Sequence, residues 1–254
     1  MTKTQNVTNI NAKAFASKCF LAITLIAGIT LSSCKKDEAT TQAEVTQEDA
    51  ADAIESSLVN STYGLTASVT ESSAYAAGAG IYVTTSSLEC GHLYSNTYSS
   101  SGNTGSYSHN YTINRNYQLN CDEAGNHQSF VYNFDMNGTY ETPRMSSDDS
   151  ATSSWSITGL SPSSTFAIFN GSYQRNGSQH SKVRNMRSFT SVINYTLNSL
   201  TVNKSTHTIT SGSASVSINA SSGSNNYTYI GSITFNGNGT ATLLLNGTTY
   251  TIIL

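Results

Sequence analysis

Large and polar residues alternate along this chain from about residue 81 to residue 254. The clearest stretch carries its large side chains on every second position: Tyr107, His109, Tyr111, Ile113, Arg115, Tyr117, Leu119 and Cys121. The residues between them are Ser, Asn, Thr or Gln. A period of two places the two sets on opposite faces of a strand. The pattern is typical of an antiparallel sheet with one buried face and one solvated face.

The last residues predict three strands joined by tight turns. Residues 227–235, 240–245 and 248–254 are separated by Asn236-Gly237-Asn238-Gly239 and by Asn246-Gly247. Asn-Gly suits the positive φ angles of hairpin turns, which indicates a β-meander. We expect about ten strands in all, with loops too short for the helices that parallel strands require. The predicted fold is mostly β: a large antiparallel sheet over residues 81–254, either curled or closed as a sandwich.

A short helical segment is expected at residues 46–80, before the sheet. Thr46 and Asp49 form an approximate capping box, with Asp in the place of Glu. Apolar residues then recur at helical spacing, at Ala50, Ala53, Ile54 and Leu58. A weaker helix follows from Leu65 toward Gly78. The sequence therefore predicts an N-terminal helical pair against which the apolar face of the sheet can pack.

The N-terminal residues have the features of a secretory signal. Lys3, Lys13 and Lys18 precede an uncharged run of 13 residues, 19–31, and small residues follow it. As a helix this run would rise about 20 Å, too short for a hydrocarbon core of about 30 Å. A cleaved signal peptide over residues 1–33 is therefore favoured over a transmembrane anchor.

The next residues carry a family resemblance. Leu31-Ser32-Ser33-Cys34 resembles the lipobox of bacterial lipoproteins, which implies that Cys34 is lipidated and becomes the first mature residue. Lys35, Lys36, Asp37 and Glu38 resemble the export signal of Bacteroidota lipoproteins, which implies an outer-membrane anchor facing the cell exterior. Residues 34–45 then form a lipidated tether. The segment from residue 48 to residue 77 is similar to uncharacterised lipoproteins of that group, which implies no activity.

Two cysteines remain after such processing. If a hairpin turns near Gly105, Cys90 and Cys121 meet at its open end, and an oxidising compartment favours a disulfide between them. One alternative is a nucleophilic pair of Cys90 and His92, which would share a strand face. The other is two unpaired thiols.

Charge is scarce and unevenly distributed. Charged residues make up 11% of the chain, and the net charge of −3 provides no attraction to nucleic acid. All fifteen acidic residues precede Ser150, whereas basic residues predominate after it. Four of the latter form a candidate patch for an anionic glycan or lipopolysaccharide: Arg175, Lys182, Arg184 and Arg187. The alternative is a solubilising surface together with attraction between the two halves of one domain.

Catalytic and metal-binding signals are weak. No nucleotide-binding, zinc-protease or hydrolase motif occurs, and the five histidines are scattered, so we expect no cofactor and no metal. The acidic pairs Asp148-Asp149 and Asp122-Glu123 are interpreted as turn residues. Asp149-Ser150-Ala151 resembles the O-glycosylation motif of exported Bacteroidota proteins, which makes Ser150 a candidate modification site.

The sequence therefore predicts a surface-exposed lipoprotein, held to the membrane by its lipid anchor, that binds a glycan or a partner protein without catalysis. The alternative is a periplasm-facing carrier that holds a lipid or apolar ligand on a concave sheet. An excess of inward apolar positions over what the helices cover would favour the carrier.

Overall fold

The computed structural model describes residues 44–83 and 86–254. The predicted signal peptide, the lipidation site Cys34 and the export signal at residues 35–38 lie outside the described residues. Two short α-helices come first along the described chain, and strands follow.

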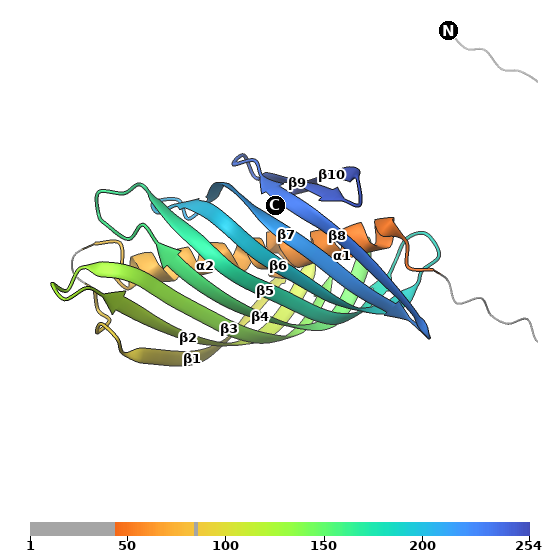
Figure 1. The fold of residues 1–254 in the computed structure, drawn as a ribbon. Coiled ribbons are helices and arrows are strands. Elements are labelled where there is room, and N and C mark those ends of the chain that lie inside the picture. Colours follow the sequence, from red (N-terminus) through yellow and green to blue (C-terminus); the bar gives the residue numbers. More distant parts are fainter. Residues whose placement is uncertain (1–43, 84–85) are drawn as a thin grey trace, which may run out of the picture. The chain divides into compact units, whose positions relative to one another are not determined.

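One antiparallel sheet contains every strand of the described chain, in sequential order from β1 to β10. The prediction of a mostly β fold is confirmed, and the sheet is curled rather than closed as a sandwich (Figure 1). The strands are β1 (Leu93–Asn103), β2 (Ser108–Cys121), β3 (His127–Glu141), β4 (Met145–Thr158), β5 (Phe166–Ser181), β6 (Ser188–Asn203), β7 (Ile209–Ser222), β8 (Asn225–Phe235), β9 (Thr240–Leu245) and β10 (Thr248–Ile253).

The expected hairpin turns are present at the C-terminal end. Asn246 and Gly247 have φ angles of 44° and 87° between β9 and β10. Gly237 and Gly239 have φ angles of 79° and 75° between β8 and β9. These left-handed conformations are costly for most residues with a Cβ, so glycine and asparagine fix the turns and the register of the meander.

The helical segment consists of α1 (Gln47–Leu58), a 3-10 turn (Asn60–Thr62) and α2 (Leu65–Gly78). The capping box predicted at Thr46 is formed in both directions with Asp49. Gly64 connects the two helices closely: a Cβ there would lie 2.6 Å from the carbonyl oxygen of Ser57. The sequence therefore specifies both the start of α1, through the capping box, and the short connection to α2, through Gly64.

The helices cover the concave face of the sheet (Figure 1). Tyr195 of β6 donates a hydrogen bond of 3.1 Å to the carbonyl oxygen of Ile54 and also contacts the hydroxyl of Ser57. The inward side chains of the sheet and the apolar side chains of α1 and α2 are buried in one hydrophobic cluster. Helices and sheet therefore share a single core.

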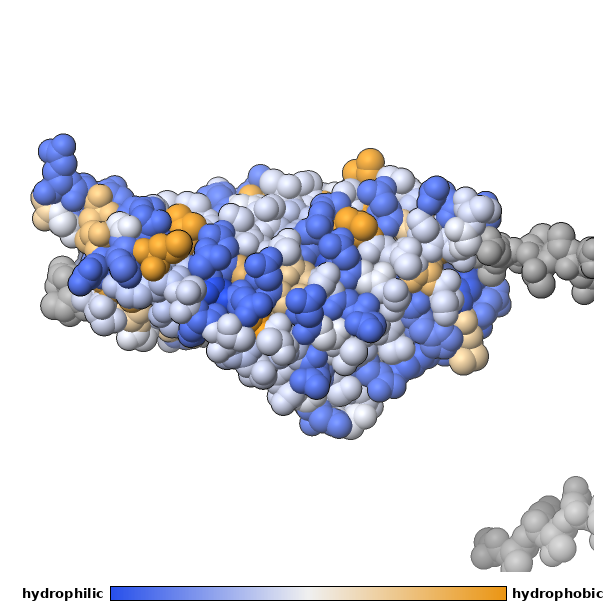
Figure 2. Space-filling view, turned by 90° about the horizontal axis from the view of Figure 1, so that it is seen from below, coloured by the Kyte–Doolittle hydropathy of each residue, from blue (hydrophilic) through white to orange (hydrophobic). Residues whose placement is uncertain are grey.

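The convex face of the sheet is mostly polar, although β6 and β8 to β10 carry exposed apolar residues at Val192, Ile230, Leu244 and Ile253. On β4, for example, the outward residues are Ser146, Asp148, Ser150, Thr152, Ser154, Ser156 and Thr158. Amide side chains form hydrogen bonds between neighbouring strands, with Nδ2 of Asn133 lying 2.9 Å from Oδ1 of Asn116. Figure 2 shows one side of the molecule, on which hydrophilic residues predominate and strongly hydrophobic ones are scattered.

None of the helices in the described chain combines the length and the apolar character that crossing a bilayer requires.

Candidate ligand-binding site

A buried ion pair ties the centre of the sheet to the turn between the helices. Nε of Arg175 on β5 lies 2.6 Å from Oδ2 of Asp149 on β4, and both side chains are at most 1% exposed. Arg175 also donates to the hydroxyl of Tyr111 and, at 3.1 Å, to the carbonyl oxygen of Thr62. Burial opposes the charge of Arg175, but Asp149 and the neighbouring tyrosines outweigh it and raise its pKa.

A second cluster fixes α1 at the end of the sheet where β5 turns into β6. Nη1 of Arg187 lies 2.7 Å from Oδ2 of Asp49, and Nε of Arg184 lies 2.9 Å from Oδ1 of the same carboxylate. Arg184 and Arg144 both bind Asp52. Burial opposes ionisation of Asp49, yet the hydrogen bonds from Arg184 and Thr46 outweigh it and hold its pKa below the usual value.

A third cluster ties α2 to the first strands. Nη1 of Arg115 lies 3.2 Å from Oε1 of Glu71, and its guanidinium lies between the rings of Tyr75 and Tyr98, at 4.3 and 4.6 Å from their centroids. Tyr98 and Tyr63 donate hydrogen bonds to Glu71. Burial raises the pKa of Glu71, although the bonds from Tyr98 and Arg115 act in the opposite direction.

These contacts correct the candidate anionic-ligand patch. Arg175 is buried and cannot belong to a surface patch. Arg184 and Arg187 bind α1, and Lys182 contacts Glu141. Ion pairs therefore connect the acidic first half of the chain to the basic second half. This agrees with the attraction between the two halves that the alternative interpretation predicted.

The acidic pairs predicted in turns behave differently from each other. Asp122 and Glu123 lie in the turn between β2 and β3, as expected. Asp148 and Asp149 lie within β4, so the prediction of a turn at this pair is wrong. Asp149 is on the buried face of the strand, where Arg175 neutralises its charge. Ser150 follows them on the convex face of β4, half-buried.

Cys90 and Cys121 form the predicted disulfide, with their Cα atoms 5.7 Å apart. Strands β1 and β2 form the expected hairpin, and Cys90 adds a bridge to Leu119 beside it. The nucleophile alternative is wrong, because the sulfur of Cys90 is bonded to Cys121; His92 packs instead against the ring of Tyr94, 4.5 Å between centroids.

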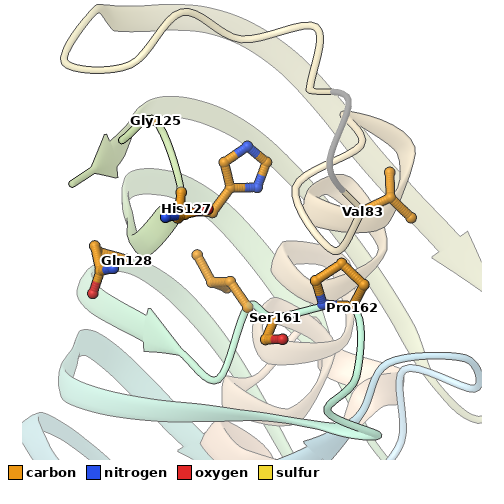
Figure 3. A pocket seen from close by; sticks show the side chains of 8 residues that line it. Val83, Gly125, His127, Gln128, Ser161 and Pro162 are labelled. Atoms are coloured by element: carbon orange, nitrogen blue, oxygen red, sulfur yellow. The ribbon is translucent and has the colours of Figure 1, made fainter. Parts of the chain in front are cut away.

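A cavity of about 290 Å³ opens at the opposite end of the strands from the α1 cluster. Three segments distant in sequence line it: the chain after α2, the start of β3, and the loop between β4 and β5 (Figure 3). Its lining residues are Val83, Gly125, Asn126, His127, Gln128, Leu160, Ser161 and Pro162. None of them is Asp, Glu, Lys or Arg.

Hydrogen bonds outside the cavity orient its polar side chains. Nδ1 of His127 lies 2.8 Å from the carbonyl oxygen of Ile81. A carbonyl only accepts, so Nδ1 carries a proton, and Nε2 can accept a hydrogen bond when the ring carries no second proton. Asp122 accepts from Nδ2 of Asn126 at 2.9 Å and from Nε2 of Gln128 at 3.2 Å. These bonds leave the amide oxygens of Asn126 and Gln128 as acceptors.

A disulfide and a lysine outside the cavity hold the segments that line it. Cys121, at the end of β2, is the strand partner of His127, at the start of β3, so the disulfide holds the strand that pairs with this part of the lining. Nζ of Lys204 lies 2.7 Å from the carbonyl oxygen of Ser161 and 5.1 Å from the ring centroid of Tyr82. The cavity is therefore preorganised by contacts that the ligand itself does not have to make.

No pattern in the sequence predicts this cavity. The spacing of His127 and Gln128 matches no binding motif, and the three segments meet only through the curvature of the sheet. Within residues 44–83 and 86–254, no group of three His, Cys, Asp or Glu side chains is placed to hold a metal ion.

Comparison with known proteins found no protein-family model, no curated protein and no solved structure that matches the chain.

Proposed function

We propose that this protein is a lipid-anchored, surface-displayed binding module. It binds a glycan or protein ligand and catalyses no reaction. The lipobox resemblance at Cys34 and the basic-acidic residues 35–38 support the anchor and its direction. The ten residues 34–43 between the lipidation site and the described chain can span at most about 35 Å.

The position of the cavity carries the proposal. Gln47, at the start of α1, hydrogen-bonds the carbonyl oxygen of Leu245 at the turn between β9 and β10. The cavity lies at the other end of the strands, and β5, with 16 residues, extends over about 50 Å between those ends. The described chain therefore begins at one end of the strands and carries the cavity at the other, which supports a role of the cavity in binding.

The carrier alternative receives less support. Its requirement is a concave apolar face larger than the helices can cover. In the described chain, α1 and α2 occupy this face, and inward residues such as Phe169 and Ile218 are completely buried. A lipid could enter only by breaking the three ionic clusters that hold the helices.

Protease accessibility on intact cells tests the display. The wild type should be digested, and the variant Lys36→Ala/Asp37→Ala/Glu38→Ala should be protected, because the export signal is removed. The matched control is Thr40→Ala/Thr41→Ala/Gln42→Ala, which changes three residues of the same tether outside the export signal and should remain digestible. Protection of the wild type would overturn surface display.

A further inference from the structure

We infer that the cavity lined by residues 125–128 and 160–162 binds one neutral sugar ring, such as the terminal residue of a glycan. This inference rests on the proposed function, since it names the ligand class of the same site. It is argued from the charge, the hydrogen-bonding character and the size of the cavity.

The lining favours a neutral ligand. No Asp, Glu, Lys or Arg lines the cavity. Of the charged groups beside the lining residues, Asp122 accepts four hydrogen bonds from its own turn and from Gln128, and Lys204 binds the carbonyl oxygen of Ser161. A charged ligand would lose hydration without gaining a counter-charge from the lining. A neutral ligand avoids this cost.

The polar groups favour a ligand rich in hydroxyl donors. Asn126, His127 and Gln128 line the cavity, and one nitrogen of each side chain is bonded to Asp122 or to the carbonyl oxygen of Ile81. The amide oxygens of Asn126 and Gln128 therefore remain available to accept hydrogen bonds from a ligand, as does Nε2 of a singly protonated His127. Acceptors of this kind are satisfied by hydroxyl donors on the ligand. Adjacent hydroxyl groups on a pyranose ring supply such donors.

The remaining lining favours a ring with an apolar face. Leu160 is 2% exposed and forms the buried part of the lining, with Val83 and Pro162 contributing further apolar surface. A sugar presents C–H groups on its ring faces and hydroxyls around its edge, which matches this division. A volume of about 290 Å³ is at the lower limit for ligand pockets and suits a single ring.

The test measures binding of free sugars to the detergent-purified full chain by saturation-transfer NMR and titration. The panel contains glucose, galactose, mannose, fucose and N-acetylglucosamine, with glucuronate and glucosamine as charged competitors. At least one neutral sugar should bind, with a Kd on the order of 1 mM because so few atoms make contact.

Three variants locate the binding. Ser161→Trp, at an exposed lining position, should fill the cavity and abolish binding. Gln128→Leu should weaken it about three- to tenfold, the effect of one hydrogen bond. Ser101→Trp, exposed on β1, adds the same side chain elsewhere and should leave binding unchanged. Circular dichroism melting checks that each variant folds.

The inference is overturned if no neutral sugar binds, if a charged competitor binds more tightly, or if folded Ser161→Trp binds as the wild type does. These results are separate from the protease test on cells. Sugar binding by a protease-protected protein would refute surface display and retain the ligand. Digestion on cells without sugar binding would retain the display and refute the ligand.

Discussion

Asp149→Asn should be among the most destabilising single changes in this chain. The substitution removes the only carboxylate bonded to Arg175 in the described chain and leaves the guanidinium buried, at 1% exposure. Breaking a buried ion pair on one side costs about 3–5 kcal/mol, because water cannot replace the lost partner. A domain of this kind has about 5–15 kcal/mol of stability, so the loss is a large share of it.

The matched control is the next residue along β4. Asp148 lies on the exposed face of the strand, so Asp148→Asn should change the free energy of unfolding by less than about 0.5 kcal/mol. The double variant Asp149→Leu/Arg175→Met removes both buried charges. It should be more stable than Asp149→Asn alone by about 2 kcal/mol, since no unpaired charge remains.

Urea denaturation followed by tryptophan fluorescence measures these differences. The chain has one tryptophan, Trp155 on β4, which is 1% exposed and reports on the same face of the sheet. The reasoning is refuted if Asp149→Asn costs less than about 1 kcal/mol with an unchanged denaturant slope, because the pair would then contribute no more than an exposed one.

Three further predictions concern single contacts. Cys121→Ser should lower the free energy of unfolding by about 3–4 kcal/mol, because the bond to Cys90 closes a loop with a separation of 31 residues; equal stability with and without reductant would contradict this. Thr46→Ala should cost about 1 kcal/mol in thermal unfolding, since it removes half of the capping box; an unchanged melting temperature would argue against that cap. The folded-state pKa of Glu71 is raised above 4.5, so stability should rise as the pH falls through the folded value toward 4.5. Glu71→Gln should reduce this rise in denaturation curves, and an identical pH dependence would count against burial of the carboxyl.

The strands could be predicted because a period of two is a local property. The alternation around Tyr111 correctly assigned the inward and outward faces of β2, and the Asn-Gly turns fixed the last three strands. The disulfide followed from a hairpin that brings two residues of matching register together.

The charged residues show where local reasoning was insufficient. Asp149 has the same parity as Trp155 and Ile157, so the sequence did contain a signal that it points inward. Its partner Arg175 is 26 residues away and could be identified only once β4 and β5 were paired. Four basic residues close in sequence therefore suggested a patch, although each one contacts an acidic side chain.

The cavity was beyond sequence reasoning for a similar reason. Val83, His127 and Ser161 come from three segments that meet only when the sheet curls around α2. The bonds that orient them involve a main-chain oxygen and a turn carboxylate, which leave no motif. Such sites depend on tertiary geometry rather than on residue spacing.

The central claim is that α1 and α2 are a permanent part of the core, which supports the proposal that ligands bind at the cavity lined by residues 125–128 and 160–162 rather than on the concave face. Native-state hydrogen exchange of the full chain tests it most directly. Backbone amides of α1 and α2 should exchange only through global unfolding, with the same free energy as the central strands β4 to β6. Exchange of the helices by a lower-energy opening that leaves those strands protected would contradict the claim and would favour a carrier with a concave binding face.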